Sequence, residues 1–370
     1  MSQPVSRRDA ALAAIASTGA AVLRGQTDSA PGIGAIGLGN RFRAHLAALS
    51  QMPEARLTAL SDLDSKKIDA VNAGLPSPAA SYTDYRELLR DKNVGAVVIA
   101  TPNFSHHDIA IAALRAGKDV LLEKPIAITY KEAREIQEEA RRNGRILAIG
   151  MQRIFRSDIE LVETIRRGEI GTPRLITSGE FRRDWFPGGW IYRDPATGKS
   201  ANWRFMKGAI GSSELEFSIH LYATLCRIIG SPLKTLSATG GALHYRDRQI
   251  RDASSTIVEF ASGLRLSHTY CMFAPQSPFV VVLGENGSLR REGGRLSLFD
   301  REGKPRPLPP VERPDGSDEV LMYRDFFECV RTRRQPQAGA GLAIEAAKIA
   351  YGQEISIAEG RVVTAGDFPA

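Results

Sequence analysis

Residues 33–42 read Ile-Gly-Ala-Ile-Gly-Leu-Gly-Asn-Arg-Phe, an apolar run that leads into a glycine-rich turn. The run Ile33–Ile36 has the length and composition of a buried strand, and an amphipathic helical pattern follows the turn. Glycines at such a turn let backbone N–H groups approach a pyrophosphate at the positive end of the helix dipole. The residues expected to make this phosphate-binding turn are Gly37, Gly39, Asn40 and Arg41.

The alternation of apolar strands and amphipathic helices continues to residue 150 and predicts a parallel sheet covered by helices. The expected strands are 33–36, 56–61, 94–100, 119–122 and 146–149, and the expected helices are 41–50, 65–73, 82–91, 106–116 and 130–143. A second glycine frame, residues 32–37, fits G-x-G-x-x-G by letter but falls within the first strand. We therefore assign the turn to residues 37–42, where Phe42 replaces the third glycine.

Asp62 stands at the end of the second expected strand, about 25 residues after Gly37. A carboxylate there accepts hydrogen bonds from a ribose and repels a 2′-phosphate, which favours NAD over NADP. The alternative is a helix N-cap, because Ser61, Asp62 and Asp64 all precede helical residues.

Two further stretches carry a resemblance to a known family. Residues 100–106 read Ala-Thr-Pro-Asn-Phe-Ser-His, and residues 117–125 read Gly-Lys-Asp-Val-Leu-Leu-Glu-Lys-Pro. With the glycine turn and Asp62, they resemble the Gfo/Idh/MocA oxidoreductases, named for glucose–fructose oxidoreductase and inositol dehydrogenase. The resemblance covers essentially the whole chain after residue 30. The further cofactor-binding residues that it implies, along the ribose and nicotinamide, are Thr101, Asn103, His106 and Glu123.

Lys124, in the Glu-Lys-Pro element, is the first catalytic candidate. A cation beside the nicotinamide can hydrogen-bond a reacting sugar hydroxyl and stabilise the alkoxide character that grows as hydride leaves. The structural alternative is a surface lysine paired with Glu123.

The pattern after residue 150 changes to longer strands, expected at 175–183, 235–245, 254–261, 264–273 and 279–283. Asn286-Gly287 is a hairpin signal, and consecutive strands joined by turns predict a mostly antiparallel sheet. We expect a Rossmann-like domain over 31–150 and an α+β domain over 151–370. The resemblance implies that this second sheet forms the substrate cleft and mediates contacts in a homo-oligomer.

Residues 208–220, Gly-Ala-Ile-Gly-Ser-Ser-Glu-Leu-Glu-Phe-Ser-Ile-His, look like the family's glycine-rich turn followed by a helix carrying Asp-x-Gly-x-His. Their spacing of four predicts Glu216 and His220 on one helical face, where the histidine takes a hydroxyl proton and the carboxylate orients it. This chain departs from the pattern: Glu216 replaces Asp, Ser218 replaces Gly, and Ala223 replaces a following Asp. The alternative is a buried structural histidine satisfied by the neighbouring glutamate.

Two tryptophans and two arginines are candidates for contacting the substrate. Flat aromatic faces suit sugar C–H surfaces and arginines hold hydroxyls, although core packing explains any single tryptophan equally well. These candidates are Arg153, Trp185, Trp203 and Arg204.

Composition excludes several classes of protein. The 370 residues carry a formal charge of +7, and the basic residues are scattered along the chain. Nucleic-acid binding is not expected, because the sequence has no long basic stripe interleaved with aromatic residues. No apolar run reaches the roughly 18 residues of a membrane span. Three cysteines lie far apart, so neither a disulfide framework nor a metal site is expected.

Residues 1–30 resemble a twin-arginine export signal: Ser6-Arg7-Arg8 precedes an alanine-rich apolar stretch ending at Leu23. Ala10 stands where a bulky apolar residue is usual, and no clean A-x-A site follows. An alanine-rich helix capped by Ser6 is the alternative. The signal predicts a periplasmic or otherwise exported protein, whereas the alternative predicts a cytoplasmic one.

The leading hypothesis is an NAD(P)-dependent oxidoreductase that removes hydride from a CH–OH of a small carbohydrate or polyol. Export suggests a second hypothesis, since free NAD is not expected outside the cytoplasm. In this case the enzyme holds its cofactor tightly and closes the redox cycle, either between two sugars or by transiently oxidising a glycoside until its bond is eliminated. A non-catalytic nucleotide-binding protein is a third hypothesis, which the presence of Lys124 and His220 disfavours.

Overall fold

The computed structural model describes residues 31–182, 191–193 and 200–369. This part of the chain begins with a six-stranded parallel sheet. Its strand order is β3-β2-β1-β4-β5-β6, and every neighbouring pair is parallel. This is the doubly wound order of dinucleotide-binding folds. The strands are β1 (Gly32–Ile36), β2 (Arg56–Ser61), β3 (Ala80–Tyr82), β4 (Ala96–Ile99), β5 (Asp119–Leu122) and β6 (Leu147–Ile149).

The helices that accompany this sheet lie within three residues of the expected bounds at each end. They are α2 (Asn40–Leu49), α3 (Ser65–Asn72), α4 (Tyr85–Arg90), α5 (His106–Arg115) and α6 (Tyr130–Arg142). The three residues of β3 were not expected as a strand, because so short a segment shows no periodicity.

Gly32 and Gly34 lie inside β1 and serve packing. A Cβ at Gly32 would lie 2.0 Å from the carbonyl oxygen of Asn93, and one at Gly34 would lie 2.7 Å from a methyl group of Leu88. The assignment of the phosphate-binding turn to residues after this strand is therefore consistent with the packing.

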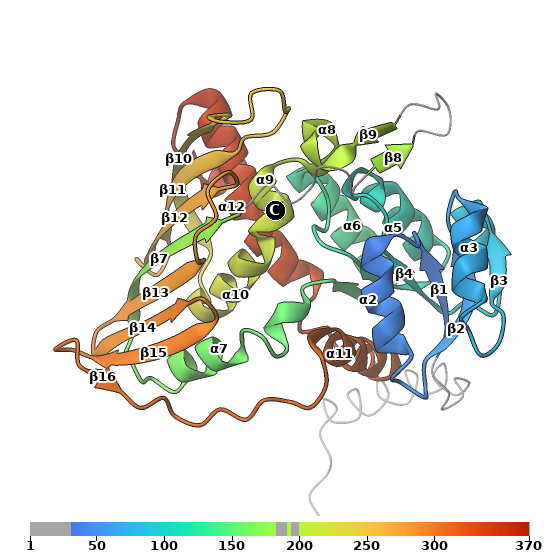
Figure 1. Cartoon of the computed structure of the whole chain (residues 1–370), viewed down its shortest axis with the longest axis horizontal. Helices are drawn as coiled ribbons and strands as arrows, with labels where there is room; N and C mark the ends of the chain where they lie inside the picture. Colours follow the sequence, from blue (N-terminus) through green and yellow to red (C-terminus); the bar gives the residue numbers. More distant parts are fainter. Residues whose placement is uncertain (1–30, 183–190, 194–199, 370) are drawn as a thin grey trace, which may run out of the picture. The chain divides into compact units, whose positions relative to one another are not determined.

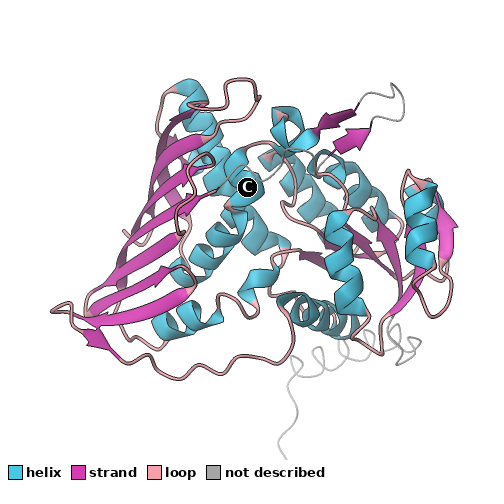
Figure 2. Ribbon diagram, viewed as in Figure 1, coloured by secondary structure: helices cyan, strands magenta, loops and turns pink. Residues whose placement is uncertain are grey.

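A nine-stranded sheet forms the second half, in the order β16-β15-β14-β13-β7-β12-β11-β10-β17. Only the β7–β12 pair is parallel, so the expected, mostly antiparallel sheet is confirmed (Figure 2). The expected hairpin joins β13 to β14 through Glu285-Asn286. The strands are β7 (Pro173–Phe181), β10 (Leu233–Gly241), β11 (Ala253–Phe260), β12 (Arg265–Cys271), β13 (Phe279–Gly284), β14 (Gly287–Glu292), β15 (Arg295–Asp300), β16 (Pro305–Arg306) and β17 (Val363–Thr364).

Helices cover one face of this large sheet and leave the other without helices in the described part of the chain (Figure 1). The covering helices are α7 (Ile159–Arg166), α9 (Ser213–Phe217), α10 (Ile219–Ile229) and α12 (Ala340–Glu359). Leu175, Ile257 and Leu283, on three strands, are exposed. A small hairpin of β8 (Ile191–Arg193) and β9 (Ser200–Asn202) precedes the short helix α8 (Lys207–Ile210).

Helix α11 (Asp318–Thr332), which precedes α12, returns to pack against α2 of the parallel sheet. Arg333, just after it, donates two hydrogen bonds of 2.8 and 3.0 Å to the buried carboxylate of Asp119 on β5. Pro31–Ala370 consequently form one compact unit, and the domain boundary at residue 150 stays a prediction. No helix among the described residues is both long and apolar enough to cross a membrane.

Candidate functional site

The turn between β1 and α2 leaves the start of that helix open. Gly37 has φ +87°, and a Cβ there would lie 2.9 Å from the backbone of Ala100, so both backbone conformation and space favour glycine. Gly39 is the N-cap of α2 and provides no side-chain cap, and a Cβ on it would meet nothing within 4 Å. Asn40 begins the helix and is exposed. The start of α2 therefore has no side-chain cap and has open space beside Gly39, as pyrophosphate binding requires.

Asp62 lies directly beside this turn. Its Oδ2 accepts a 2.8 Å hydrogen bond from the Leu38 N–H, and its Oδ1 accepts from the Asp64 N–H and from Lys67 Nζ at 3.0 and 3.2 Å. The N-cap of α3 is Asp64, which accepts from the Lys66 N–H, so the alternative role proposed for Asp62 belongs to its neighbour. A carboxylate at the end of β2 fits the ribose of a dinucleotide, and the open N-terminus of α2 beside it fits the pyrophosphate.

Glu123 is the centre of a buried ion network. Its Oε1 accepts from Arg41 Nε at 2.6 Å and from His45 Nε2 at 2.9 Å. Arg41 also reaches Glu319 on α11, and His45 reaches Tyr323. Burial alone would raise the pKa of Glu123, but Arg41 and His45 more than offset this and hold it well below its usual range. The side chains of Arg41 and Glu123, both expected at the cofactor, are thus engaged with protein groups.

His106 is likewise satisfied by the protein. It is fully buried, with Nδ1 2.8 Å from the Pro125 carbonyl oxygen and Nε2 3.0 Å from that of Thr101. The Thr101 hydroxyl accepts a hydrogen bond from Ser105. Burial lowers the pKa of His106, although its contacts with the two carbonyl oxygens oppose this shift. Its contacts join the loops after β4 and β5, whereas the resemblance implied a place along the nicotinamide.

Three side chains meet at the buried carboxylate of Glu216, which is 1% exposed. Lys124 Nζ lies 3.2 Å from Oε1 and Arg204 Nη2 lies 2.8 Å from the same oxygen, while Asn103 donates to Oε2 at 2.8 Å. Burial opposes ionisation of Glu216, but Lys124 and Arg204 prevail and lower its pKa. The pairing of Lys124 with Glu123 considered as an alternative is wrong, since the ammonium group contacts Glu216.

The single helix expected to carry Glu216 and His220 is interrupted. Helix α9 ends at Phe217, α10 begins at Ile219, and Ser218 joins them. In a continuous helix the Glu216 carbonyl would accept from the His220 N–H. Here it accepts a 2.7 Å hydrogen bond from Lys124 Nζ. The Lys124 ammonium group therefore binds the carbonyl oxygen that is left free at the break. Glu216 lies on α9 and His220 on α10.

One ring nitrogen of His220 has no hydrogen-bond partner among the described residues. Its Nδ1 is buried without a hydrogen-bond partner in the described structure, and no hydrogen bond joins it to Glu216. Burial, together with the positive charges of Lys124 and Arg153, places the pKa of His220 well below 6.5. The geometry thus differs from that of a structural histidine satisfied by Glu216.

The substrate candidates separate in the structure. Trp203 is only 8% exposed and packs in a small apolar cluster, so its core alternative holds. Arg204 is committed to Glu216. Arg153, 40% exposed, lies 3.1 Å from Asp158, and Trp185 lies outside the described residues.

Several of these contacts involve residues that pattern analysis did not select. His45 follows Arg41 by one helical turn, a spacing that could have flagged it. Asp158 and Arg291, which also pair, come from distant segments, and no local signal links them. No group of three metal-binding side chains occurs among residues with a described placement.

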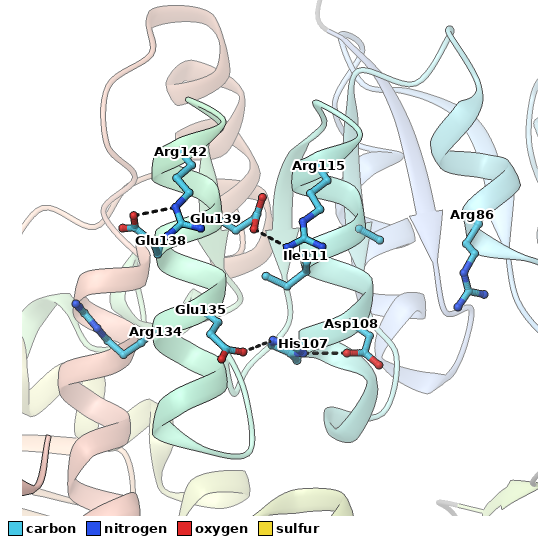
Figure 3. A pocket seen from close by; sticks show the side chains of 11 residues that line it. Arg86, His107, Asp108, Ile111, Arg115, Arg134, Glu135, Glu138, Glu139 and Arg142 are labelled. Atoms are coloured by element: carbon cyan, nitrogen blue, oxygen red, sulfur yellow. Dashed lines mark hydrogen bonds and ion pairs between the residues drawn. The ribbon is translucent and has the colours of Figure 1, made fainter. Parts of the chain in front are cut away.

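A pocket on the outer side of α5 and α6 is separate from this site (Figure 3). It is lined mainly by charged side chains that pair with one another, as His107 does with Asp108 and Glu135, and Arg115 does with Glu139. Its charges are satisfied at the surface, so it offers no comparable chemistry.

Two protein-family models match this sequence. Residues 32–151 match the model of an oxidoreductase family with an NAD-binding Rossmann fold, and residues 159–290 match the Gfo/Idh/MocA C-terminal domain. The chain belongs to the Gfo/Idh/MocA family. It is therefore an NAD(P)-dependent oxidoreductase with an NAD-binding Rossmann domain.

Individual relatives span most of the chain. It is 26% identical to the uncharacterised oxidoreductase YrbE of Bacillus subtilis, over 90% of this chain and 95% of the relative. It is 29% identical to the scyllo-inositol 2-dehydrogenase (NAD(+)) of the same organism, over 81% and 86% of the two chains. Among solved structures, the aldose-aldose oxidoreductase of Caulobacter crescentus shares the fold, with TM-score 0.76, 21% identity and coverage of 90% and 99%.

Asp62→Ala is expected to reduce the preference for NAD over NADP by about 10-fold or more, each factor of ten being about 1.4 kcal/mol. The variant removes the carboxylate that opposes a 2′-phosphate and leaves Lys67 beside the vacated position. The ratio of dissociation constants for NADH and NADPH measures the effect.

Asp64→Ala is the matched control, because it removes a nearby carboxylate whose role is to cap α3. Asp62→Ala combined with Lys67→Met should lose the gain in NADPH affinity. An unchanged ratio in a folded Asp62→Ala protein would remove Asp62 from cofactor selection.

Turnover should stay flat from about pH 8 to pH 6.5 and decline only in more acidic solution. His220 must be neutral to accept a proton, and a pKa below 6.5 keeps it neutral down to lower pH. Lys124→Met should move the acid midpoint upward, because a positive charge that lowers the His220 pKa is removed. The test is kcat against pH with Tm recorded alongside; a midpoint at or above 6.5 in the parent enzyme contradicts this assignment.

Proposed function

We propose that the enzyme oxidises a CH–OH group of a sugar, sugar derivative or polyol, with His220 as the proton acceptor and Lys124 as the cation that orients the reacting oxygen. The observation that carries the proposal is the buried, unpartnered Nδ1 of a neutral imidazole whose pKa is lowered first by burial and then by Lys124. The similarity to an inositol dehydrogenase supports a polyhydroxylated substrate. Bound NAD supplies the hydride acceptor, and Gly37, Gly39 and Asn40 would hold its pyrophosphate.

Lys124 is held so that part of its hydrogen-bonding capacity remains. Two of the three ammonium N–H groups are directed to the carboxylate and the carbonyl of Glu216. The third is left for a substrate oxygen. Burial lowers the pKa of Lys124 despite the opposing effect of Glu216, which eases any proton movement through this group.

Glu216 is then a positioning residue, although its spacing from His220 suggested a catalytic one. Its two oxygens accept from Asn103, Lys124 and Arg204, and no hydrogen bond joins it to the His220 ring in the described structure. Its negative charge keeps a buried lysine charged and fixed in place. The proton lost by the substrate hydroxyl goes to His220.

A closed redox cycle is the second candidate, prompted by Ser6-Arg7-Arg8. An exported enzyme with tightly held NAD(P) would oxidise one sugar and reduce another, or cleave a glycoside by transient oxidation. The fold shared with an aldose-aldose oxidoreductase is compatible with it. Mass spectrometry of material released on denaturation separates the two candidates, since retained NAD(P) favours the closed cycle and an empty protein favours a dissociable cofactor.

The open face of the nine-stranded sheet is our proposed oligomer contact. It presents Leu175, Ile257 and Leu283, exposed apolar side chains from β7, β11 and β13. A second copy covering this face would remove them from water.

His220→Ala and Lys124→Ala should each lower turnover by about 10²–10⁴-fold, the usual loss for a positioned acid–base group. Both proteins should keep their affinity for NADH, because neither side chain is expected to hold the cofactor. His220→Ala should keep the Tm of the parent, whereas Lys124→Ala should lower it, because Glu216 loses a partner of its buried ion pair. Turnover, Tm and NADH affinity are measured on the same preparations.

His107→Ala and Lys131→Ala are matched controls, since both residues lie on the outer side of the Rossmann domain. A cofactor-loaded His220→Ala enzyme that keeps most of its activity would exclude His220 and favour Lys124 as the proton acceptor.

Replacing both Arg7 and Arg8 by lysine should strand the protein inside its native cell, because the twin-arginine pathway reads the guanidinium pair. Fractionation of cells that express the parent and the double variant measures this. Arrival of the double variant in the envelope would reject the export proposal without affecting the catalytic one.

A further inference from the structure

Asp158 anchors a second charged cluster close to His220. It is fully buried at the start of α7, and its Oδ2 accepts from the Thr224 hydroxyl. The same hydroxyl lies 3.0 Å from the His220 carbonyl oxygen. Asp158 is therefore one hydrogen-bonded side chain away from the backbone of the proposed proton acceptor.

Two arginines converge on one oxygen of this carboxylate. Arg291, on β14, contacts Oδ1 and is 15% exposed, while Arg153, in the short turn after β6, lies 3.1 Å from the same oxygen and is 40% exposed. One buried carboxylate balances one guanidinium. The cluster consequently carries an excess of one positive charge, and the more exposed Arg153 is the member that presents it.

Two charged neighbours have partners of their own: Arg227 donates to the Ile154 carbonyl, and Glu163 pairs with Arg166. Arg153 has no other hydrogen-bond or ion-pair partner within the described residues. Four of its five N–H groups thus remain for solvent or a ligand.

We propose that Arg153 binds a negatively charged group of the substrate, so that the enzyme acts on an acidic sugar. This rests on the proposed sugar or polyol oxidation and narrows its substrate class. A planar guanidinium suits a carboxylate through two parallel hydrogen bonds. Arg153 is also among the cations that lower the pKa of His220, consistent with proximity to the reacting group.

The test uses the NADH-loaded full chain and calorimetric titration with matched sugar pairs. D-glucuronate, D-galacturonate and D-mannuronate are each compared with the neutral parent sugar, and glucose 6-phosphate provides a phosphate arm. At least one uronate should bind about 10- to 100-fold more tightly than its parent, the range of a charge-assisted hydrogen-bond pair. Arg153→Gln should abolish this preference, and Arg153→Lys should keep part of it.

Arg166→Gln is the matched control, since it removes the same charge from an exposed position in the same region. Neutral sugars binding as well as uronates, a preference that survives Arg153→Gln, or absence of uronate binding would each overturn the inference. Tighter binding of glucose 6-phosphate than of every uronate would also reject the carboxylate. Failure of the proposed oxidation is distinguished by a separate readout, namely the absence of NAD reduction by every sugar tested.

Discussion

The ion pair between Lys124 and Glu216 is the interaction on which the proposed site depends. Lys124 follows β5 of the parallel sheet, Glu216 lies on α9 beneath the antiparallel sheet, and Asn103 and Arg204 complete the set from two further segments. Removing one member of a buried pair typically destabilises a protein by about 3–5 kcal/mol, because a charge is left without compensation. This pair therefore both aligns the two halves of the chain and fixes the cation beside His220.

A second buried carboxylate, that of Glu123, connects distant segments of the chain near the proposed cofactor site. Glu123 holds Arg41 and His45 on α2, and through them reaches Glu319 and Tyr323 on α11. The helix that presents the open phosphate turn is thereby joined to a segment almost three hundred residues later in the chain. Adjacent residues in the Glu-Lys-Pro element thus have different partners: Glu123 binds side chains of α2, and Lys124 pairs with Glu216 in the proposed site.

Much of the fold could be predicted because its signals are local. Glycine turns, alternating strands and amphipathic helices located the parallel sheet within a few residues, and Asp62 could be placed beside the turn by counting. The destinations of charged side chains could not be read in this way. The same letters are compatible with Glu123 at a ribose or at Arg41, and only the packing of α11 against α2 decides between them. The break in the helix at Ser218 could not be predicted for a similar reason. The group that donates to the Glu216 carbonyl is the side chain of Lys124, which is distant in the sequence.

The reach of Glu216 has a consequence for how relatives of this chain diverge. Its carboxylate meets an amide, an ammonium and a guanidinium that stand at fixed distances from its backbone. A relative with the shorter aspartate withdraws that carboxylate by one methylene, so the same three donors no longer converge on it. Positions 103, 204 and 216 are therefore expected to change as a set, and substitutions that exchange one of them alone between relatives should be poorly tolerated.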